Sequence, residues 1–275
     1  MKPEDRDFTK GLARAFAGAI FFALPLLMTM EMWYLGFYID SARLAIFMAF
    51  MLPLLVGIDR FSGFKRTSTW WEDLVDGLVA YAVGFVASAV ILLLFNLIDF
   101  TMPLREVVGK IALQAVPASF GAVIANSQLA GDKQAEEEEE ELIAQSGYPA
   151  ELLFMLAGAV FLAFNLAPTE EMILLGFIMS PRHVIVLAFA SLIVMHGFVY
   201  AASFRGTPER NPEIPHWSLF LRFSVVGYII SLLVCGYVLW TFGRFQDQEI
   251  AMSLMQTVVL AFPAAIGAAG ARLVL

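Results

Sequence analysis

Apolar residues fall into long runs along the chain, and short polar segments separate these runs. A helix needs roughly 20 apolar residues to cross about 30 Å of hydrocarbon. The runs predict eight transmembrane helices, at about 14–38, 42–59, 74–98, 106–127, 152–179, 183–204, 217–241 and 250–274. The predicted fold class is therefore all-α, and the predicted protein class is a polytopic membrane protein.

Composition agrees with this pattern. Of the 275 residues, 60% are hydrophobic and 15% are charged, which is more apolar than a soluble domain requires. The first run is too long for a signal peptide, and no small-residue cleavage site follows it. The single cysteine, Cys235, excludes an intramolecular disulfide and a cysteine-based metal cluster.

The two halves of the chain share a repeated sequence. Segments 18–37, GAIFFALPLLMTMEMWYLGF, and 158–177, GAVFLAFNLAPTEEMILLGF, are identical at eleven of twenty positions without a gap. Biased composition explains matches of Ala and Leu, but not Thr, Glu, Met, Gly and Phe matching in order. Such a fixed offset indicates an internal repeat.

The last predicted helix of each half matches as well. Segment 115–125, AVPASFGAVIA, aligns with 261–271, AFPAAIGAAGA. We therefore predict two copies of a four-helix unit, at 11–128 and 151–275, joined by an acidic cytoplasmic linker at 129–150. Because four is even, both copies cross the membrane in the same direction, as parallel repeats with pseudo-two-fold symmetry.

Positive charge is divided unevenly between the two sides of the predicted bundle. Twelve of the 17 Lys and Arg fall on the side of the termini, and five fall on the other side. The positive-inside rule then predicts that both termini are in the cytoplasm. The net charge of −8 does not change this prediction, because the rule counts Lys and Arg and not acidic residues. The run Glu136–Glu141 is expected to be solvated, with a cytoplasmic site for cations or for a basic partner as the alternative.

A stripe of mostly small residues marks the first predicted helix. On a continuous helix Gly18, Pro25, Thr29 and Gly36 would share one face, which favours close helix packing in lipid. Glu31 would lie about 140° from this stripe. Because a carboxyl group facing lipid is costly, both faces should meet protein or water. We therefore expect the first and fifth helices to be the central elements of the bundle.

The same two helices carry a candidate ion site. Glu31 and Glu171 occupy equal positions in the two copies, and Glu170 adjoins the second. Prolines at 25 and 168 each free a backbone carbonyl, which nearby hydroxyl or amide groups must bond. A carboxyl group within a membrane can hold a proton or bind a cation. The predicted proton- or ion-binding residues are Glu31, Glu171, Glu170, Thr29, Thr169 and Asn165.

Two further polar residues at membrane depth are candidate accessory residues. His196 lies inside the sixth predicted helix, where a hydrogen-bonded interior histidine is the alternative to a ligand. Lys110 lies about one turn into the fourth helix, and a lysine there is expected to reach toward the surface. The pattern names no particular metal and no cofactor.

These features favour a channel or transporter for protons or small cations. The expected partners are the lipid bilayer and the transported ion; nucleic acid is not expected because the chain has no basic patch. A structural, scaffold or sensor protein without transport is the alternative. The chain is expected to be a monomer or a homodimer.

An intramembrane enzyme is a weaker alternative. Glu170, Glu171 and His196 resemble the glutamate proteases of the CAAX-processing type, which also have about eight spans. The arginine expected four positions after the second glutamate is replaced by Leu175, and no late-span histidine is present. The chain also has no His-Glu-x-x-His or Gly-x-Ser-x-Gly motif. The residues therefore favour a protein that is not an enzyme.

As a whole, the chain resembles a family of bacterial integral membrane proteins of unknown function. The resemblance rests on the segment PLLMTMEMWYLG and its counterpart NLAPTEEMILL, and it extends over nearly the full length. It implies a location in the bacterial inner membrane, and it implies no substrate.

Overall fold

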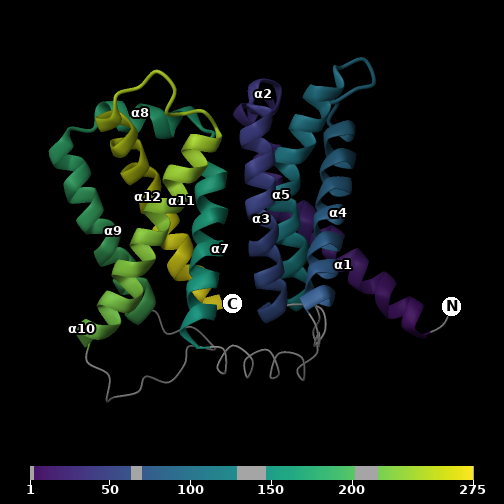
Figure 1. Ribbon diagram of the computed structural model, residues 1–275, viewed down its shortest axis with the longest axis horizontal. Coiled ribbons are helices and arrows are strands. Elements are labelled where there is room, and N and C mark those ends of the chain that lie inside the picture. Colours follow the sequence, from purple (N-terminus) through teal and green to yellow (C-terminus); the bar gives the residue numbers. More distant parts are fainter. Residues whose placement is uncertain (1–2, 63–69, 129–146, 202–215, 275) are drawn as a thin grey trace. The chain divides into compact units, whose positions relative to one another are not determined.

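The computed structural model describes residues 3–62, 70–128, 147–201 and 216–274. These residues form helices and short turns, without a strand (Figure 1). They contain eight helical stretches long and apolar enough to cross a membrane. The predicted all-α fold with eight candidate spans is confirmed. The chain divides into two compact units, Met1–Ser146 (unit 1) and Gly147–Leu275 (unit 2).

Unit 1 is built around its last helix. Its elements are α1 (Pro3–Leu27), α2 (Met30–Tyr38), α3 (Ser41–Ser62), α4 (Trp70–Leu94) and α5 (Leu104–Gln128). Helix α5 contacts each of the other four. Its middle is rich in small residues, and Ala115, Ala118 and Ala122 have no exposed surface. Small side chains allow several helices to approach α5 at once.

Unit 2 is also built around its last helix. Its elements are α7 (Tyr148–Leu166), α8 (Glu170–Ile178), α9 (Pro181–Ala201), α10 (His216–Leu219), a π-helical turn η1 (Phe220–Val225), α11 (Val226–Thr241) and α12 (Ile250–Val274). Helix α12 contacts α7, α8, α9 and α11. Within each unit the last span, and not the first, contacts all the other spans. The expectation that the first and fifth spans are central concerns the whole bundle, and it stays a prediction.

Glycines set the closest helix contacts in both units. In unit 1 a Cβ atom on Gly18 would collide with the carbonyl oxygen of Gly121, and the reverse also holds. In unit 2 Gly158 and Gly267 have the same relation. The interpretation of the small-residue stripe as a packing surface is confirmed at Gly18 and Gly158.

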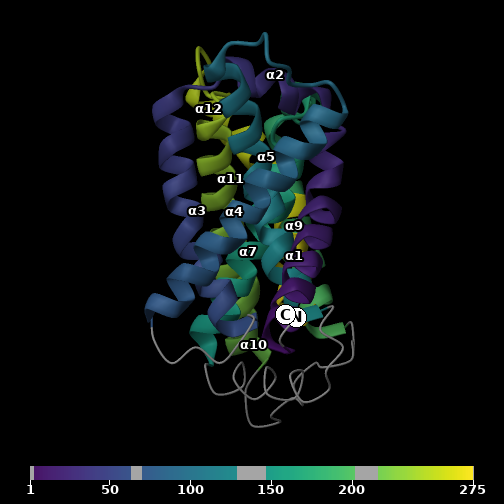
Figure 2. The same cartoon turned by 90° about the vertical axis from the view of Figure 1, so that its right-hand side faces the viewer.

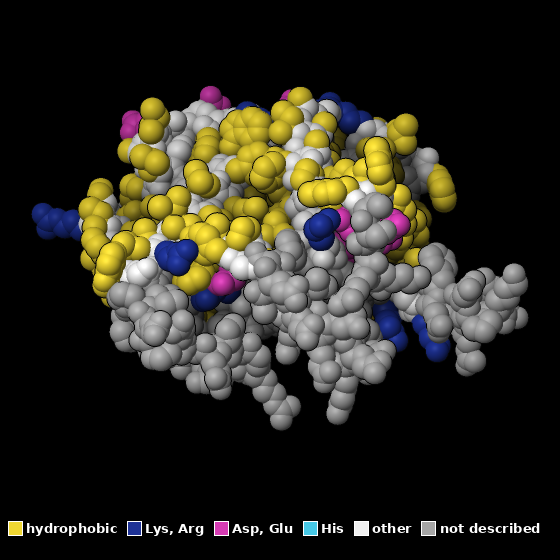
Figure 3. Space-filling view, turned by 60° about the horizontal axis from the view of Figure 1, so that its bottom comes forward, with side chains coloured by type: hydrophobic (Ala, Val, Ile, Leu, Met, Phe, Trp, Pro, Cys, Tyr) yellow, Lys and Arg dark blue, Asp and Glu magenta, His cyan; other side chains and the backbone are white. Residues whose placement is uncertain are grey.

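The sides of the helices are apolar outside as well as inside. Large hydrophobic side chains such as Leu93, Phe189 and Ile193 are exposed. Figure 3 shows hydrophobic side chains over much of the described part of this face, with fewer charged side chains among and beside them. An exposed apolar surface of this kind is what contact with lipid requires, and it agrees with the apolar spans.

Two of the predicted spans are not continuous. The expected helices at about 14–38 and 152–179 each break into a long helix, α1 or α7, and a short one, α2 or α8. At each break a threonine, Thr29 or Thr169, has an extended backbone. The stretches long enough to span, Thr9–Leu27 and Tyr148–Leu166, end before the short helices.

Candidate functional site

The two short helices lie at one end of their units. Figure 1 shows α8 across the top of the helices of unit 2. Figure 2 shows α2 at the top of the helices of unit 1. We call this the short-helix end of each unit. Chain order places the start of α3 and α5 there in unit 1, and the start of α9 and α12 there in unit 2.

In unit 1 side chains bond the backbone carbonyls at the break. The Thr29 hydroxyl donates to the Pro25 carbonyl at 2.6 Å, and the Trp33 indole N–H donates to Leu27 at 2.9 Å. The Gln114 amide of α5 donates to the Leu26 carbonyl at 3.3 Å. A helix end leaves carbonyls without intrahelical partners, so these three bonds stabilise the break inside an apolar bundle. Thr29 thus bonds a backbone carbonyl at the break, but it is the carbonyl of Pro25 and not the one that Pro25 frees, that of Phe21.

In unit 2 different side chains bond the backbone carbonyls at the break. The Thr169 hydroxyl donates to the Leu166 carbonyl at 2.8 Å, and the Asn165 amide donates to Phe161 at 2.7 Å. The Arg244 guanidinium, from the turn between α11 and α12, donates to the Pro168 carbonyl. Thr169 and Asn165 therefore bond backbone carbonyls near the break, but neither bonds the carbonyl of Phe164, which Pro168 frees.

The predicted acidic residues begin the short helices. Glu31 is the second residue of α2 and is half-buried, whereas Glu170 and Glu171 are the first two residues of α8 and are exposed. The expectation that they lie within a continuous span is wrong, because each helix breaks two residues before its acidic turn. A carboxylate in the first turn interacts favourably with the helix dipole, which explains its presence there without a membrane-depth role.

Lys110 is buried under α2. Its side chain is 10% exposed, and Nζ lies 2.6 Å from Oε1 of Glu106 and 3.0 Å from the Leu97 carbonyl oxygen. A Cβ atom on Gly36 would lie 2.6 Å from Cγ of Lys110, so α2 rests directly on this lysine. The expectation that Lys110 reaches the surface is therefore wrong. The buried charge is tolerated because a carboxylate and a carbonyl compensate it.

Gln256 is buried in the equivalent place under α8. It is 2% exposed, and a Cβ atom on Gly176 would lie 2.6 Å from its Cγ. Neither of its amide atoms has a hydrogen-bond partner among the described residues. The same holds for buried atoms of three other residues at this end, Asn165 Oδ1, Arg244 Nε and Gln248 Oε1. The described part of unit 1 has two such atoms, Ser88 Oγ in α4 and Gln114 Oε1 in α5.

His196 lies far from the acidic residues. Its Nδ1 is 2.9 Å from the hydroxyl of Ser224 in the π-helical turn, and its ring packs edge-on against Phe220. Fifteen residues of α9 separate it from Pro181, or about 22 Å at 1.5 Å per residue. The unit therefore does not bring His196 together with Glu171, as the glutamate-protease alternative would need.

The turn between α4 and α5 contains an acidic group whose titration is shifted. Asp99 accepts hydrogen bonds from the Thr101 hydroxyl at 2.5 Å, from its N–H at 2.6 Å, and from the Met102 N–H at 3.0 Å. These bonds, the Thr101 hydroxyl first, lower the pKa of Asp99 below its ordinary value. The carboxylate is thereby held ionised beside Lys110.

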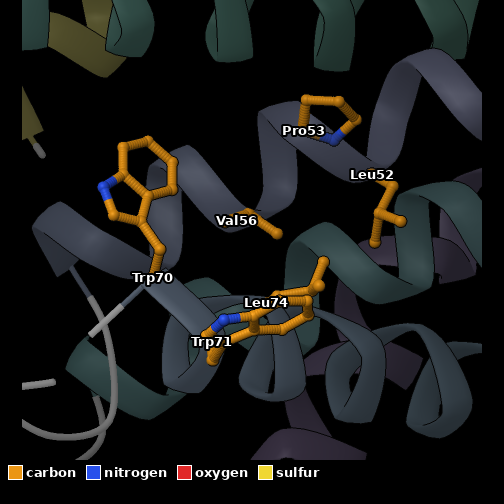
Figure 4. A pocket seen from close by; sticks show the side chains of 6 residues that line it. All are labelled: Leu52, Pro53, Val56, Trp70, Trp71 and Leu74. Atoms are coloured by element: carbon orange, nitrogen blue, oxygen red, sulfur yellow. The ribbon is translucent and has the colours of Figure 1, made fainter.

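Two apolar hollows occur in the described part of unit 1. One, of about 340 Å³, lies between α3 and α4 and is lined by Leu52, Pro53, Val56, Trp70, Trp71 and Leu74 (Figure 4). The other, of about 300 Å³, lies between α2, α3 and α5, and Arg105 is its one charged lining residue. Within the described segments no group of three His, Cys, Asp or Glu could hold a metal ion.

Several of these residues were missed as candidates by sequence reasoning. Glu106 could have been found, because it precedes Lys110 by four residues, the spacing of a helical ion pair. Gln114, Gln248 and Arg244 carry no such signal, since only the packing of different helices shows that their polar atoms are buried.

Comparison with known protein families shows which family the chain belongs to. Residues 11–275 match the protein family described as "Putative integral membrane protein (DUF2391)". The chain belongs to this family. The match covers both units, including the residues of both breaks and both short helices. No curated protein and no solved structure matches the chain.

Proposed function

We propose that this DUF2391 protein moves protons or small cations across a membrane, using sites at the two helix breaks. The observation that carries the proposal is the interruption of the first span at corresponding places in both units. In transporters, interrupted segments at corresponding places of two halves point to the binding site. Each break here is followed at once by a glutamate, Glu31 or Glu171.

The proposal includes descent of the two units from one four-helix repeat. It is supported by the same element order in both, by the Gly18–Gly121 and Gly158–Gly267 contacts, and by short helices of nine residues each. We further propose that these repeats are parallel, that they occupy a bacterial inner membrane, and that both termini are cytoplasmic. The uneven distribution of Lys and Arg supports the last point.

The chemistry at each break suits a small cation or a proton. A carboxylate at the start of the short helix attracts cations, and a threonine lies two residues before Glu31 and before Glu171; unit 2 adds the amide oxygen of Asn165. Hard cations prefer such oxygen ligands. Because α2 and α8 each lie at one end of their own unit, each proposed site is at that end of its unit and not at the middle of the spans.

A structural role is the second candidate, and one observation favours it in unit 1. Side chains bond the backbone carbonyls at both breaks, but in unit 1 the buried Lys110 is also neutralised by Glu106, whereas the buried Gln256 of unit 2 has no partner among the described residues. A short-helix end whose buried polar groups are paired can serve to fold the unit without moving an ion. We therefore assign the larger share of transport to unit 2.

Flux into liposomes tests the proposal. The purified full-length chain is reconstituted, and proton and potassium fluxes are measured for wild type and for the double variant Glu31→Gln/Glu171→Gln. We expect the variant to lose about tenfold or more, the factor that corresponds to one charge-assisted contact of about 1.5–3 kcal/mol. Glu249→Gln, an exposed residue at the start of α12, is the matched control and should keep wild-type flux.

Equal flux in all three proteins, or no flux above that of empty liposomes, would contradict transport. In that case the structural role would stand, and the glutamates would serve as first-turn residues of α2 and α8.

A further inference from the structure

We infer that the hollow between α2, α3 and α5 of unit 1 binds an anionic phospholipid of the surrounding bilayer. Its lining comes mainly from these three helices, with Phe85 of α4 added, and is almost entirely apolar. The residues are Gly36, Ile39, Ser41, Leu44, Ala45, Met48, Phe85, Arg105, Val108, Gly109 and Ala112. This inference is independent of transport, because none of the residues proposed for the ion site lines the hollow.

The shape of the hollow depends on missing side chains. Gly36 and Gly109 meet so closely that a Cβ atom on Gly109 would collide with the Gly36 carbonyl oxygen. Ala45 and Ala112 add only methyl groups to the walls. The hollow of about 300 Å³ is thus open to the side of the helices and apolar along its length. It suits part of an acyl chain, which is apolar and flexible.

The charge at the rim selects the headgroup. Arg105 is exposed, and within the described residues it has no ion pair and no hydrogen bond from its side chain. It is the second residue of α5, a helix of 25 residues. The N–H groups of Glu106 and Val107 bond the Pro103 carbonyl, which leaves those of Leu104 and Arg105 at the start of the helix for a ligand. A cation at a helix N-terminus opposes the helix dipole, whereas a phosphate there would interact favourably with both.

Nearby acidic charge does not cancel this preference. Asp40 precedes α3, and its carboxylate accepts the N–H groups of Ala42 at 3.1 Å and Arg43 at 2.9 Å. Its charge is therefore held at the N-terminus of α3. Glu106, next to Arg105, bonds Lys110.

The hollow between α3 and α4, shown in Figure 4, differs from this one in the charge beside it. Arg60, a cation of α3, lies over the Trp70 ring and bonds the buried Asp73 at 2.7 Å, so it is already neutralised. None of the residues that line this hollow is charged. The contrast gives the inference its specificity, since an acyl chain alone would bind equally well in both hollows.

Thermal unfolding of the purified chain in detergent tests the inference. Phosphatidylglycerol, phosphatidylcholine with the same acyl chains, or inorganic phosphate is added, and the unfolding midpoint is followed by tryptophan fluorescence. We expect phosphatidylglycerol to raise the midpoint most and phosphate alone to leave it unchanged. In Arg105→Gln the apparent affinity for phosphatidylglycerol should fall about fivefold, to the level of phosphatidylcholine.

A second variant tests the groove itself. Ala45→Trp places a large side chain in the hollow from an exposed position, and it should abolish the response to both lipids. Arg182→Gln removes an exposed arginine at the start of α9 and should respond as wild type does. If Ala45→Trp does not purify as a folded protein, native mass spectrometry of wild type and Arg105→Gln decides, because wild type should retain more phosphatidylglycerol.

Three results would overturn the inference. They are an equal response to the two lipids in wild type, an unchanged preference in Arg105→Gln, and a shift produced by inorganic phosphate alone.

Discussion

The short-helix ends of the two units differ in how their buried polar groups are satisfied. Under α2, Lys110 bonds Glu106 and the Leu97 carbonyl. Under α8, Gln256 is as deeply buried, yet neither of its amide atoms has a partner in the described part of the unit. Buried polar groups are nearly always hydrogen-bonded, so unpaired ones mark places where water or a ligand enters. We therefore regard unit 1 as the structural half and unit 2 as the half that admits a polar species.

The glycine contacts common to both units should give the largest effect. Gly18→Val and Gly158→Val each place a side chain against a backbone carbonyl that cannot move away. We expect each variant to lose more than about 4 kcal/mol of its free energy of unfolding, which is enough to abolish folded protein. The measurement is the yield of monodisperse protein in size-exclusion chromatography. Gly197→Val is the control, because a Cβ atom there meets nothing within 4 Å; equal yields of the three variants would contradict the packing account.

The two buried side chains under the short helices should respond differently to the same replacement. Lys110→Met leaves Glu106 without its partner, and we expect a cost of about 3 kcal/mol. Gln256→Met removes two unpaired polar atoms at similar volume, and we expect no cost or a gain of about 1 kcal/mol. Unfolding in detergent, followed by tryptophan fluorescence, measures both. A larger cost for Gln256→Met than for Lys110→Met would reverse the assignment of the two units.

The two threonines at the breaks should give smaller and similar effects. Thr29→Val and Thr169→Val each remove one hydrogen bond to a carbonyl, at 2.6 Å and 2.8 Å respectively. We expect each replacement to lower the free energy of unfolding by about 1 kcal/mol. The same unfolding experiment measures them, with Thr→Ser as the replacement that keeps the bond. If the serine variants lose as much as the valine variants, the hydroxyl bonds do not stabilise the breaks.

The smallest effect concerns the turn beside Lys110. Hydrogen bonds, first from the Thr101 hydroxyl, lower the pKa of Asp99, so its ionised form stabilises the fold. That contribution is present above the unfolded pKa of about 3.9 and is lost as the pH falls through the lower folded value. Thr101→Val should raise the pKa of Asp99, as read from the carboxyl shift by NMR. An unchanged pKa would show that the hydroxyl bond is unimportant.

The positions of the spans could be predicted from the sequence, but the breaks could not. Long apolar runs locate helices that cross a membrane, because only helices satisfy their own backbone in lipid. The same runs continue through Thr29 and Thr169 into the short helices, so hydrophobicity alone joins two elements into one. A threonine before Glu is a helix-start signal, and giving it more weight would have separated α2 from α1.

The residues proposed for the ion site lie around the two breaks, with the threonines at the breaks and the glutamates in the first turns of α2 and α8. That they bind an ion stays a prediction. Their depth was wrong, since it followed from a continuous helix. Gln256 and Arg244 became visible only when packing showed which polar atoms are buried, and that information depends on contacts between helices far apart in the sequence.

The central claim is that transport depends on the break of unit 2 more than on that of unit 1. The most direct test compares cation and proton flux in liposomes for Glu171→Gln and Glu31→Gln, with Glu249→Gln as the control. We predict a loss of about tenfold for Glu171→Gln and less than about threefold for Glu31→Gln, since one charge-assisted contact corresponds to about the larger factor. A larger loss in Glu31→Gln, or wild-type flux in both, would contradict the account.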